Sequence, residues 1–124
     1  MSSPATQLGS QPRFWRLRAT IEESARLHAE HHRLVLRSPR IAAAAQPGQF
    51  LHIWCHPPAE MDRPPCAAIL RRPFSISRVR QPDVVEVLLR VRGTGGRILA
   101  AKQAGDLLDV IGPLGRGFRF PENL

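Results

Sequence analysis

Regular alternation of apolar and polar residues, interrupted by proline and glycine turns, is the feature that most limits the folds open to this chain. Between residues 14 and 22 every second residue is apolar, which predicts a strand that buries one face. That face consists of Trp15, Leu17, Ala19 and Ile21. A second alternating segment covers residues 32–37 and ends at Ser38-Pro39, because proline interrupts strand pairing.

Four further strands are predicted along the chain. The turn Gln46-Pro47-Gly48 precedes a third strand at residues 49–55, and a short fourth strand covers residues 74–78. Consecutive prolines within residues 56–68 indicate a long loop between them. Residues 84–91 are the most apolar and β-branched segment, so we expect the central strand there, and a sixth strand at residues 106–111.

The one helix that we predict follows a glycine cluster. Gly93-Thr94-Gly95-Gly96 precedes a segment of good helix formers at residues 97–103, which Gly105 closes. Six mostly antiparallel strands with one short helix are typical of an all-β fold. They favour a small closed barrel over a parallel α/β sheet.

The length of 124 residues corresponds to about one domain, and residues 1–12 read as a flexible N-terminal arm. No apolar segment approaches the roughly 18 residues that span a bilayer, so we expect a cytoplasmic protein without membrane contact. The chain has only two cysteines, Cys55 and Cys66. They cannot supply the four thiolates of an iron–sulfur cluster, so any such cluster must lie elsewhere.

The formal net charge of +8 comes almost entirely from arginine, since Lys102 is the single lysine. Such a balance suits nucleic acid, an acidic partner or a phosphate-bearing ligand. The arginines are scattered, so charge alone does not choose among these classes. A barrel that stacks single-stranded nucleic acid on Phe14, Trp15 and Trp54 is the alternative from a different functional class.

Two segments are candidates for phosphate binding. The glycine cluster lies between a strand and a helix N-terminus, where backbone N–H groups favour an anion. It lacks the third glycine of a dinucleotide fingerprint, because position 98 is Ile98, and taken alone it is better explained as a connector. In the second segment, Arg71-Arg72-Pro73-Phe74-Ser75, proline would fix a guanidinium for phosphate contact, although an edge strand with Phe74 in the core explains it equally well.

Histidines and cysteines offer no convincing metal site. His28, His31 and His32 lie together, but on a strand His52 and His56 would face one side and Cys55 the other, so we expect no metal. Asp106 and Asp109 flank a buried strand without a placed partner. We therefore predict no catalytic acid or base.

Four segments taken together resemble a known family in their order and spacing. They are Pro47-Gly48-Gln49-Phe50, Arg71-Arg72-Pro73-Phe74-Ser75-Ile76, the segment from Leu89 to Gly96, and the segment from Gly105 to Gly115. They resemble the FAD-binding barrel of the ferredoxin-reductase superfamily. The second and fourth segments are most similar to the electron-transfer subunit of dihydroorotate dehydrogenase B.

This resemblance implies a six-stranded antiparallel Greek-key barrel over residues 13–120, with FAD across one side and the start of a linker at residues 121–124. It assigns Arg72 to the pyrophosphate, Pro73 and Phe74 to the border of the flavin and ribityl chain, and Ser75 to the isoalloxazine edge. It places Leu88, Leu89 and Arg90 along the cofactor, and Gly95 and Gly96 at the helix N-terminus. Gly96 stands where the family has threonine.

The resemblance also implies a role in pyrimidine biosynthesis, where electrons pass between a [2Fe–2S] cluster, FAD and NAD, beside an FMN-containing dihydroorotate dehydrogenase catalytic subunit. The family continues beyond the position of Leu124 into the parts that hold the cluster and NAD. We therefore expect a truncated, catalytically incomplete chain. A related reductase subunit, serving a hydrogenase, sulfide dehydrogenase or transhydrogenase, is the nearest alternative.

Overall fold

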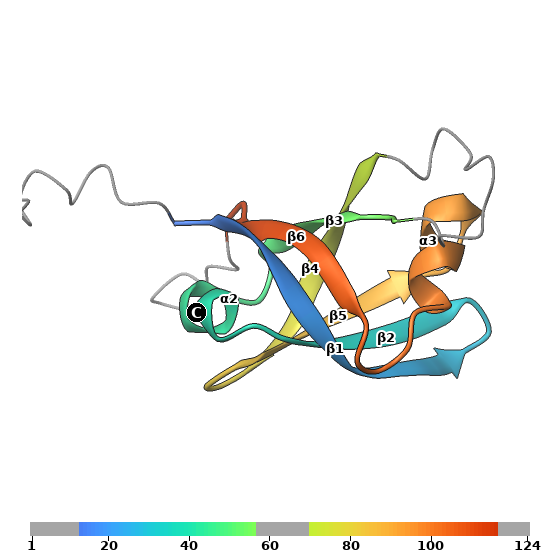
Figure 1. The fold of residues 1–124 in the computed structure, drawn as a ribbon, viewed down its shortest axis with the longest axis horizontal. Coiled ribbons are helices and arrows are strands. Elements are labelled where there is room, and N and C mark those ends of the chain that lie inside the picture. The colour runs from blue at the N-terminus through green and yellow to red at the C-terminus, as the bar shows by residue number, and fades with distance from the viewer. Residues whose placement is uncertain (1–12, 57–69, 117–124) are drawn as a thin grey trace, which may run out of the picture.

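The computed structural model describes residues 13–56 and 70–116 of the chain. This part contains six strands and two short helices (Figure 1). In chain order they are β1 (Trp15–His28), β2 (His31–Arg37), α2 (Pro39–Ala44), β3 (Phe50–Trp54), β4 (Arg71–Arg80), β5 (Val84–Arg90), α3 (Gly93–Ala100) and β6 (Leu107–Leu114).

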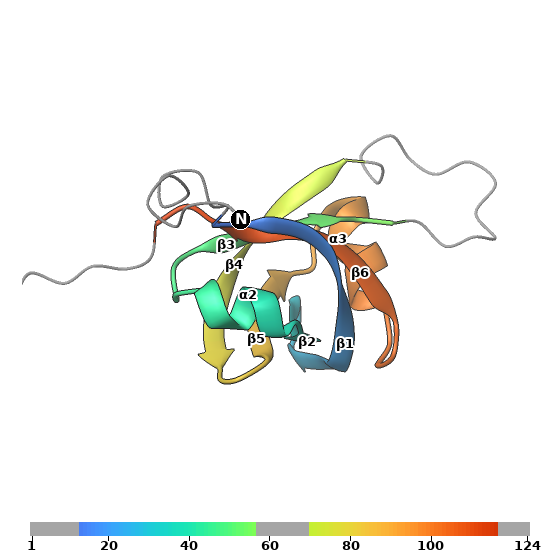
Figure 2. The same ribbon diagram turned by 60° about the vertical axis from the view of Figure 1, so that its left-hand side comes forward.

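The strands form a closed barrel in the order β1-β2-β5-β4-β3-β6, and every neighbouring pair is antiparallel. The four strands β2-β5-β4-β3 have Greek-key order. Strands β3, β4 and β5 pair one after the other, and β2, which comes before them in the chain, lies beside β5. The predicted six-stranded antiparallel barrel is therefore confirmed. Figures 1 and 2 place α2 and α3 toward opposite ends of this barrel.

Alternation along the strands fills the barrel interior with apolar side chains. On β1 the predicted apolar face points inward, and Ala19 and Ile21 are fully buried. On β5 the inward residues are Val85, Val87 and Leu89, which are buried in the same core. Both helices add to this core, which accounts for their positions at the barrel ends.

Helix α2 was not predicted. The sequence indicated only that a strand ends at Ser38-Pro39. Pro39 occupies the first turn of α2, where proline is tolerated since its missing N–H has no acceptor within the helix. Ile41 and Ala42 are completely buried in the core. Burial of these two side chains explains why so short a segment is helical.

Three strands extend more than one residue beyond their predicted bounds, and one of them, β6, continues to Leu114 although its predicted end is residue 111. β1 pairs with β6 through residues 15–20 and with β2 through residues 20–28, with a register shift between Ile21 and Glu23. β4 has ten residues and includes Pro73, which stands opposite His52 of β3. Among the described residues, no helix is long and apolar enough to cross a membrane.

Candidate functional site

Arg72 of β4 and Gly95 of α3 meet at one end of the barrel. Arg72 stands opposite Ile53 of β3, whose side chain is buried, so the Arg72 side chain leaves β4 on the inner face. A Cβ atom on Gly95 would lie 2.9 Å from Arg72 Nε and 2.9 Å from the Sγ atom of the buried Cys55. Close approach therefore requires glycine at position 95.

The N-terminal end of α3 has neither a side-chain cap nor an acidic residue. Gly93 has a φ of +72°, a left-handed conformation that favours glycine and turns the chain from β5 into the helix. Arg92, the N-cap residue, forms no side-chain cap, and the first turn contains no acidic residue. The first N–H groups have no acceptor within the helix, so this end carries partial positive charge beside the guanidinium of Arg72.

The tip of the β1–β2 hairpin holds the segment that leads into α3. The Glu30 carboxylate accepts hydrogen bonds from Nε of Arg90 and Nε of Arg92, both at 3.1 Å. The Glu30 carbonyl accepts a third from the N–H of Val91 at 2.6 Å. The bonds from Arg90 and Arg92 lower the pKa of Glu30. The side chain of Arg90, one of the predicted cofactor residues, is thus engaged by Glu30.

The outer faces of β4 and β5 expose a second set of predicted residues. Pro73 and Ser75 are exposed on β4, and Leu88 is 48% exposed on β5. Phe74 and Leu89 alternate with them and face the core, where Leu89 is buried and Phe74 is partly buried. A ligand on this outer face could therefore contact the side chains of Pro73, Ser75 and Leu88.

Gly95 and Gly96 are both buried in the first turn of α3, but only Gly95 is sterically constrained. A Cβ atom on Gly96 would lie 3.4 Å from the nearest atom, the carbonyl oxygen of Arg90, and Gly96 has no positive φ. Two groups of predicted residues are placed to reach a ligand. Arg72, Gly95 and Gly96 lie at the barrel end, and Pro73, Ser75 and Leu88 lie on the outer face of β4 and β5. The other three are placed differently, because Phe74 and Leu89 face the core and Arg90 binds Glu30.

Asp109 has partners, contrary to the prediction that it lacks one. Arg71 donates from Nη2 to Asp109 Oδ1 at 2.5 Å and from Nη1 to the Asp109 carbonyl at 3.2 Å. Arg16 donates to Asp109 Oδ2 at 3.1 Å. Partial burial raises the pKa of Asp109, but the bonds from Arg16 and Arg71 outweigh it and lower the pKa overall. Arg71 thus connects β4 to β6 and does not point toward α3.

The cysteine and histidines at the end of β3 have different surroundings. Cys55 is fully buried beside Gly95, and burial raises the pKa of its thiol while the charge of Arg72 partly offsets the rise. His52 and His56 alternate with it on the outer side, and residues 13–56 and 70–116 contain no cluster of three metal-ligating side chains. Cys66 lies outside the described residues.

Relatives with known descriptions identify a family for this chain, although no protein-family model matches it. It is 45% identical over 85 residues to the dihydroorotate dehydrogenase B electron transfer subunit of Desulforamulus reducens, covering 68% of this chain and 30% of the relative. It is 34% identical over 106 residues to that of Shouchella clausii, covering 85% and 38%. The chain thus spans about a third of the length of these relatives.

Solved structures share the fold at lower identity. An NADH-dependent reduced ferredoxin-NADP oxidoreductase matches with a TM-score of 0.65 and 24% identity, over 82% of this chain and 34% of that one. A siderophore utilization protein from T. fusca matches with a TM-score of 0.67 and 22% identity, over 90% and 49%. The predicted resemblance to ferredoxin-reductase-type barrels and to dihydroorotate dehydrogenase B subunits is confirmed, whereas nothing in these matches supports nucleic-acid binding.

Proposed function

We propose that this chain, a homologue of the electron transfer subunits of dihydroorotate dehydrogenase B, is the FAD-binding part of such a subunit. In the complete assembly, electrons would pass between FAD, an iron–sulfur cluster and NAD. The partner would be an FMN-containing catalytic subunit that oxidises dihydroorotate to orotate. The names of the relatives, which specify NAD(+) and electron transfer, support this assignment.

The observation that carries the FAD proposal is the contact between Arg72 and the glycine-rich end of α3. A pyrophosphate carries two negative charges, and a guanidinium can bind its oxygens through a planar pair of N–H groups. The open N–H groups of α3 would supply further donors to the same group. Because Gly95 has no Cβ, the Arg72 side chain can lie directly against the first turn of α3, where the two kinds of donor could reach the same group. The site therefore fits the pyrophosphate of FAD.

The outer face of β4 and β5 fits the ring system. Pro73 and Leu88 offer exposed apolar surface for a flat ring, and the Ser75 hydroxyl between them can donate or accept one hydrogen bond. Bound FAD would supply the capacity to exchange electrons singly or in pairs. The residues of this chain would orient the ring and fix its phosphates.

Titration of the 124-residue chain with FAD tests the proposal. We expect saturable binding, and we expect Arg72→Ala to weaken it by about 1.5–3 kcal/mol, the range for a hydrogen bond to a charged group. Arg72→Lys should restore only part of the loss, because one ammonium cannot replace the planar fork. Arg78→Ala, which removes an exposed arginine from the same strand, is the control. Equal losses in both alanine variants, or no FAD binding at all, would refute the site.

A further inference from the structure

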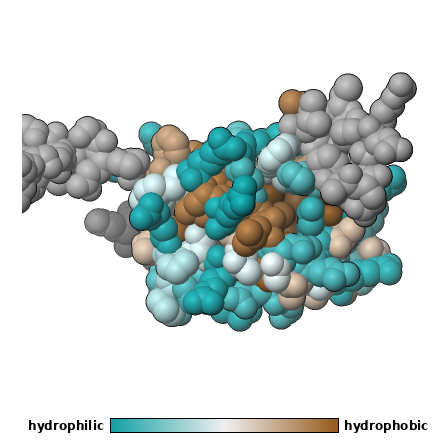
Figure 3. Space-filling view, viewed as in Figure 1, coloured by the Kyte–Doolittle hydropathy of each residue, from teal (hydrophilic) through white to brown (hydrophobic). Residues whose placement is uncertain are grey.

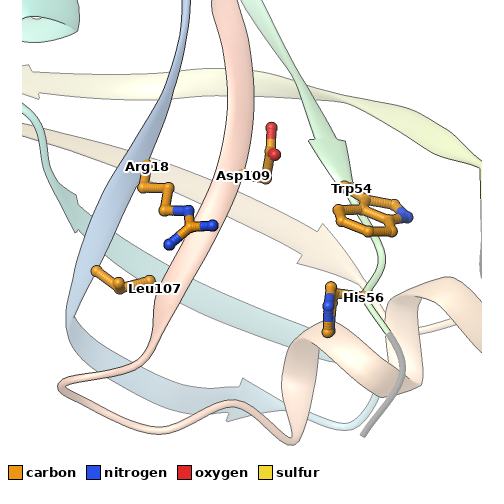
Figure 4. Close-up of a pocket in the computed structure, with 5 residues that line it drawn as sticks. All are labelled: Arg18, Trp54, His56, Leu107 and Asp109. Atoms are coloured by element: carbon orange, nitrogen blue, oxygen red, sulfur yellow. The ribbon is translucent and has the colours of Figure 1, made fainter. Parts of the chain in front are cut away.

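A pocket lies on the outer face of the barrel, away from the contact between Arg72 and Gly95. It has a volume of about 250 Å³ and lies over β1, β6 and the end of β3 (Figure 4). Figure 3, viewed as Figure 1, shows apolar surface in the middle of the face on which β1 and β6 lie, bordered by hydrophilic residues. The pocket is lined by Arg18, Trp54, His56, Leu107 and Asp109.

This pocket is distinct from the site at the N-terminus of α3. Trp54 and His56 line it, whereas Cys55 between them is buried and approaches Gly95. The chain turns at Cys55, where the N–H of His56 donates to the Trp54 carbonyl at 2.9 Å, and the buried Cys55 side chain points away from the pocket that its two neighbours line. The chain at the end of β3 therefore lies between the two sites. The inference below therefore does not depend on FAD binding.

Positive charge is in surplus around the pocket. Arg16, Arg18 and Arg71 surround a single carboxylate, that of Asp109, which already binds Arg16 and Arg71. Arg18 stands opposite Asp109 across the β1–β6 pair, yet within the described part of the chain its side chain has no hydrogen bond or ion pair. Figure 4 shows the Arg18 guanidinium extending over β6 from one side of the pocket, with Trp54 and His56 on the other side. An anion in the pocket would give Arg18 a partner.

The side opposite Arg18 is aromatic. The rings of Trp54 and His56 are 4.6 Å apart between centroids and meet edge to face at 78°. Leu107, which is 53% exposed, adds an aliphatic surface. A cavity of about 150 Å³ is enough for benzene, so the present volume has room for one ring and an anionic substituent. Offset stacking on Trp54 would orient such a ring.

We propose that this pocket binds a small aromatic anion, a planar ring that carries a phosphate or carboxylate group. The anionic group pairs with Arg18, and the ring lies against Trp54 and Leu107. Both halves of the ligand contribute to binding, because the pocket supplies one charged side and one apolar side. A ligand with only one of the halves binds more weakly.

Tryptophan fluorescence tests this site in the 124-residue chain. The chain has two tryptophans, Trp15 and Trp54. The guanidinium carbon of Arg40 lies 5.6 Å from the ring centre of Trp15. The variant Trp15→Phe leaves Trp54 as the only tryptophan. Phenyl phosphate is the probe, and phenol and inorganic phosphate represent its two halves. We expect phenyl phosphate to change Trp54 emission in a saturable way, with an affinity about tenfold or more above that of either half, equivalent to at least about 1.4 kcal/mol.

Two arginine variants of β1 show where the anion binds. Arg18→Gln should lower the affinity for phenyl phosphate about tenfold, equivalent to about 1.4 kcal/mol, and leave that for phenol unchanged. Arg26→Gln removes an exposed arginine about 26 Å further along the strand and should change neither. Equal effects of the two variants, or an emission change that never saturates, would overturn the proposal. Loss of phenyl phosphate binding in Arg72→Ala would assign the anion to the α3 site and would also overturn it.

Discussion

The side chain of Arg72 passes so close to Gly95 that a Cβ atom at position 95 would lie 2.9 Å from Arg72 Nε. The same Cβ atom would lie 2.9 Å from Cys55 Sγ. These three residues come from β4, from α3 and from the position just after β3. Their contact fixes the distance between the guanidinium and the N-terminal turn of the helix, on which the proposed pyrophosphate site depends.

Gly95→Ala should therefore destabilise the fold. Arg72 can shift its flexible side chain, but the buried Cys55 cannot move away without disturbing the core. Overpacking of this kind costs about 1–3 kcal/mol, which urea unfolding would measure. Gly96→Ala is the matched control, since its Cβ meets no atom closer than 3.4 Å. A loss as large in Gly96→Ala would contradict the account.

Gly96→Thr should be accepted by the backbone and should strengthen FAD binding. Gly96 does not require a positive φ, and threonine is favoured over glycine in a helix. If the pyrophosphate lies at the start of α3, the new hydroxyl adds one hydrogen bond, worth about 0.5–1.5 kcal/mol. Calorimetric titration with FAD and a melting curve of the free chain would be compared. Weaker binding together with a lower melting temperature would reject the placement of Gly96.

Arg71→Ala should reduce stability even without FAD, because Arg71 joins β4 to β6 through Asp109. The two side chains are only 22% and 18% exposed, so we expect a loss of about 1.5–3 kcal/mol, typical of a hydrogen bond to a charged group. Arg16→Ala removes the other partner of the same carboxylate, but Arg16 is 67% exposed and solvent screens its charge. Its effect should be much smaller. Urea unfolding of both variants at pH 7 would compare the two losses of unfolding free energy. A larger loss in Arg16→Ala than in Arg71→Ala would refute the prediction.

Stability should fall as the pH is lowered from 7 toward 5, in part because of His32. This side chain is buried, its Nε2 lies 2.7 Å from Ser24 Oγ, and burial lowers the pKa of its imidazole. The unfolded chain, with an ordinary histidine pKa of about 6.5, then takes up the proton more readily than the folded chain. The contribution of neutral His32 to folding stability is complete above the pKa of the unfolded chain. It is lost as the pH falls through the lower pKa of His32 in the folded chain.

Unfolding free energies at a series of pH values would test this. His32→Gln should flatten the dependence between pH 7 and 5, whereas His28→Gln, which replaces an exposed histidine of the same hairpin, should leave it unchanged. An unaltered slope in His32→Gln would assign the dependence to other groups.

Local sequence was sufficient for features that depend on neighbouring residues. The alternation from Trp15 to Ile21 predicted the buried face of β1, because that face follows from short-range geometry. A helix after β5 was also predicted, but at residues 97–103. The observed helix α3 spans Gly93–Ala100, so the glycine cluster forms its first turn and does not precede it. The helix α2 was missed, since its stability comes from burying Ile41 and Ala42 in a barrel end that only the complete fold creates.

The contacts of Asp109 and Glu30 could not be predicted for a related reason. Arg16 and Arg71 are 93 and 38 residues away from Asp109 in sequence, and Arg90 and Arg92 are 60 and 62 residues away from Glu30. No local pattern marks such pairs. The pairs of Asp109 form because the strand order places β1 directly beside β6 and β4 only one strand away, beyond β3. The pairs of Glu30 form because β2 lies beside β5, which brings the tip of the β1–β2 hairpin near the end of β5.

The barrel is closed by the pairing of β1 with β6, the first and the last of its six strands. Until Leu107–Leu114 is in place, β1 and β3 each keep a row of unpaired backbone groups. Such open edges pair readily with strands of other chains. A nascent chain, or one cleaved ahead of β6, therefore passes through a state in which self-association competes with folding, and completion of the last strand ends that exposure.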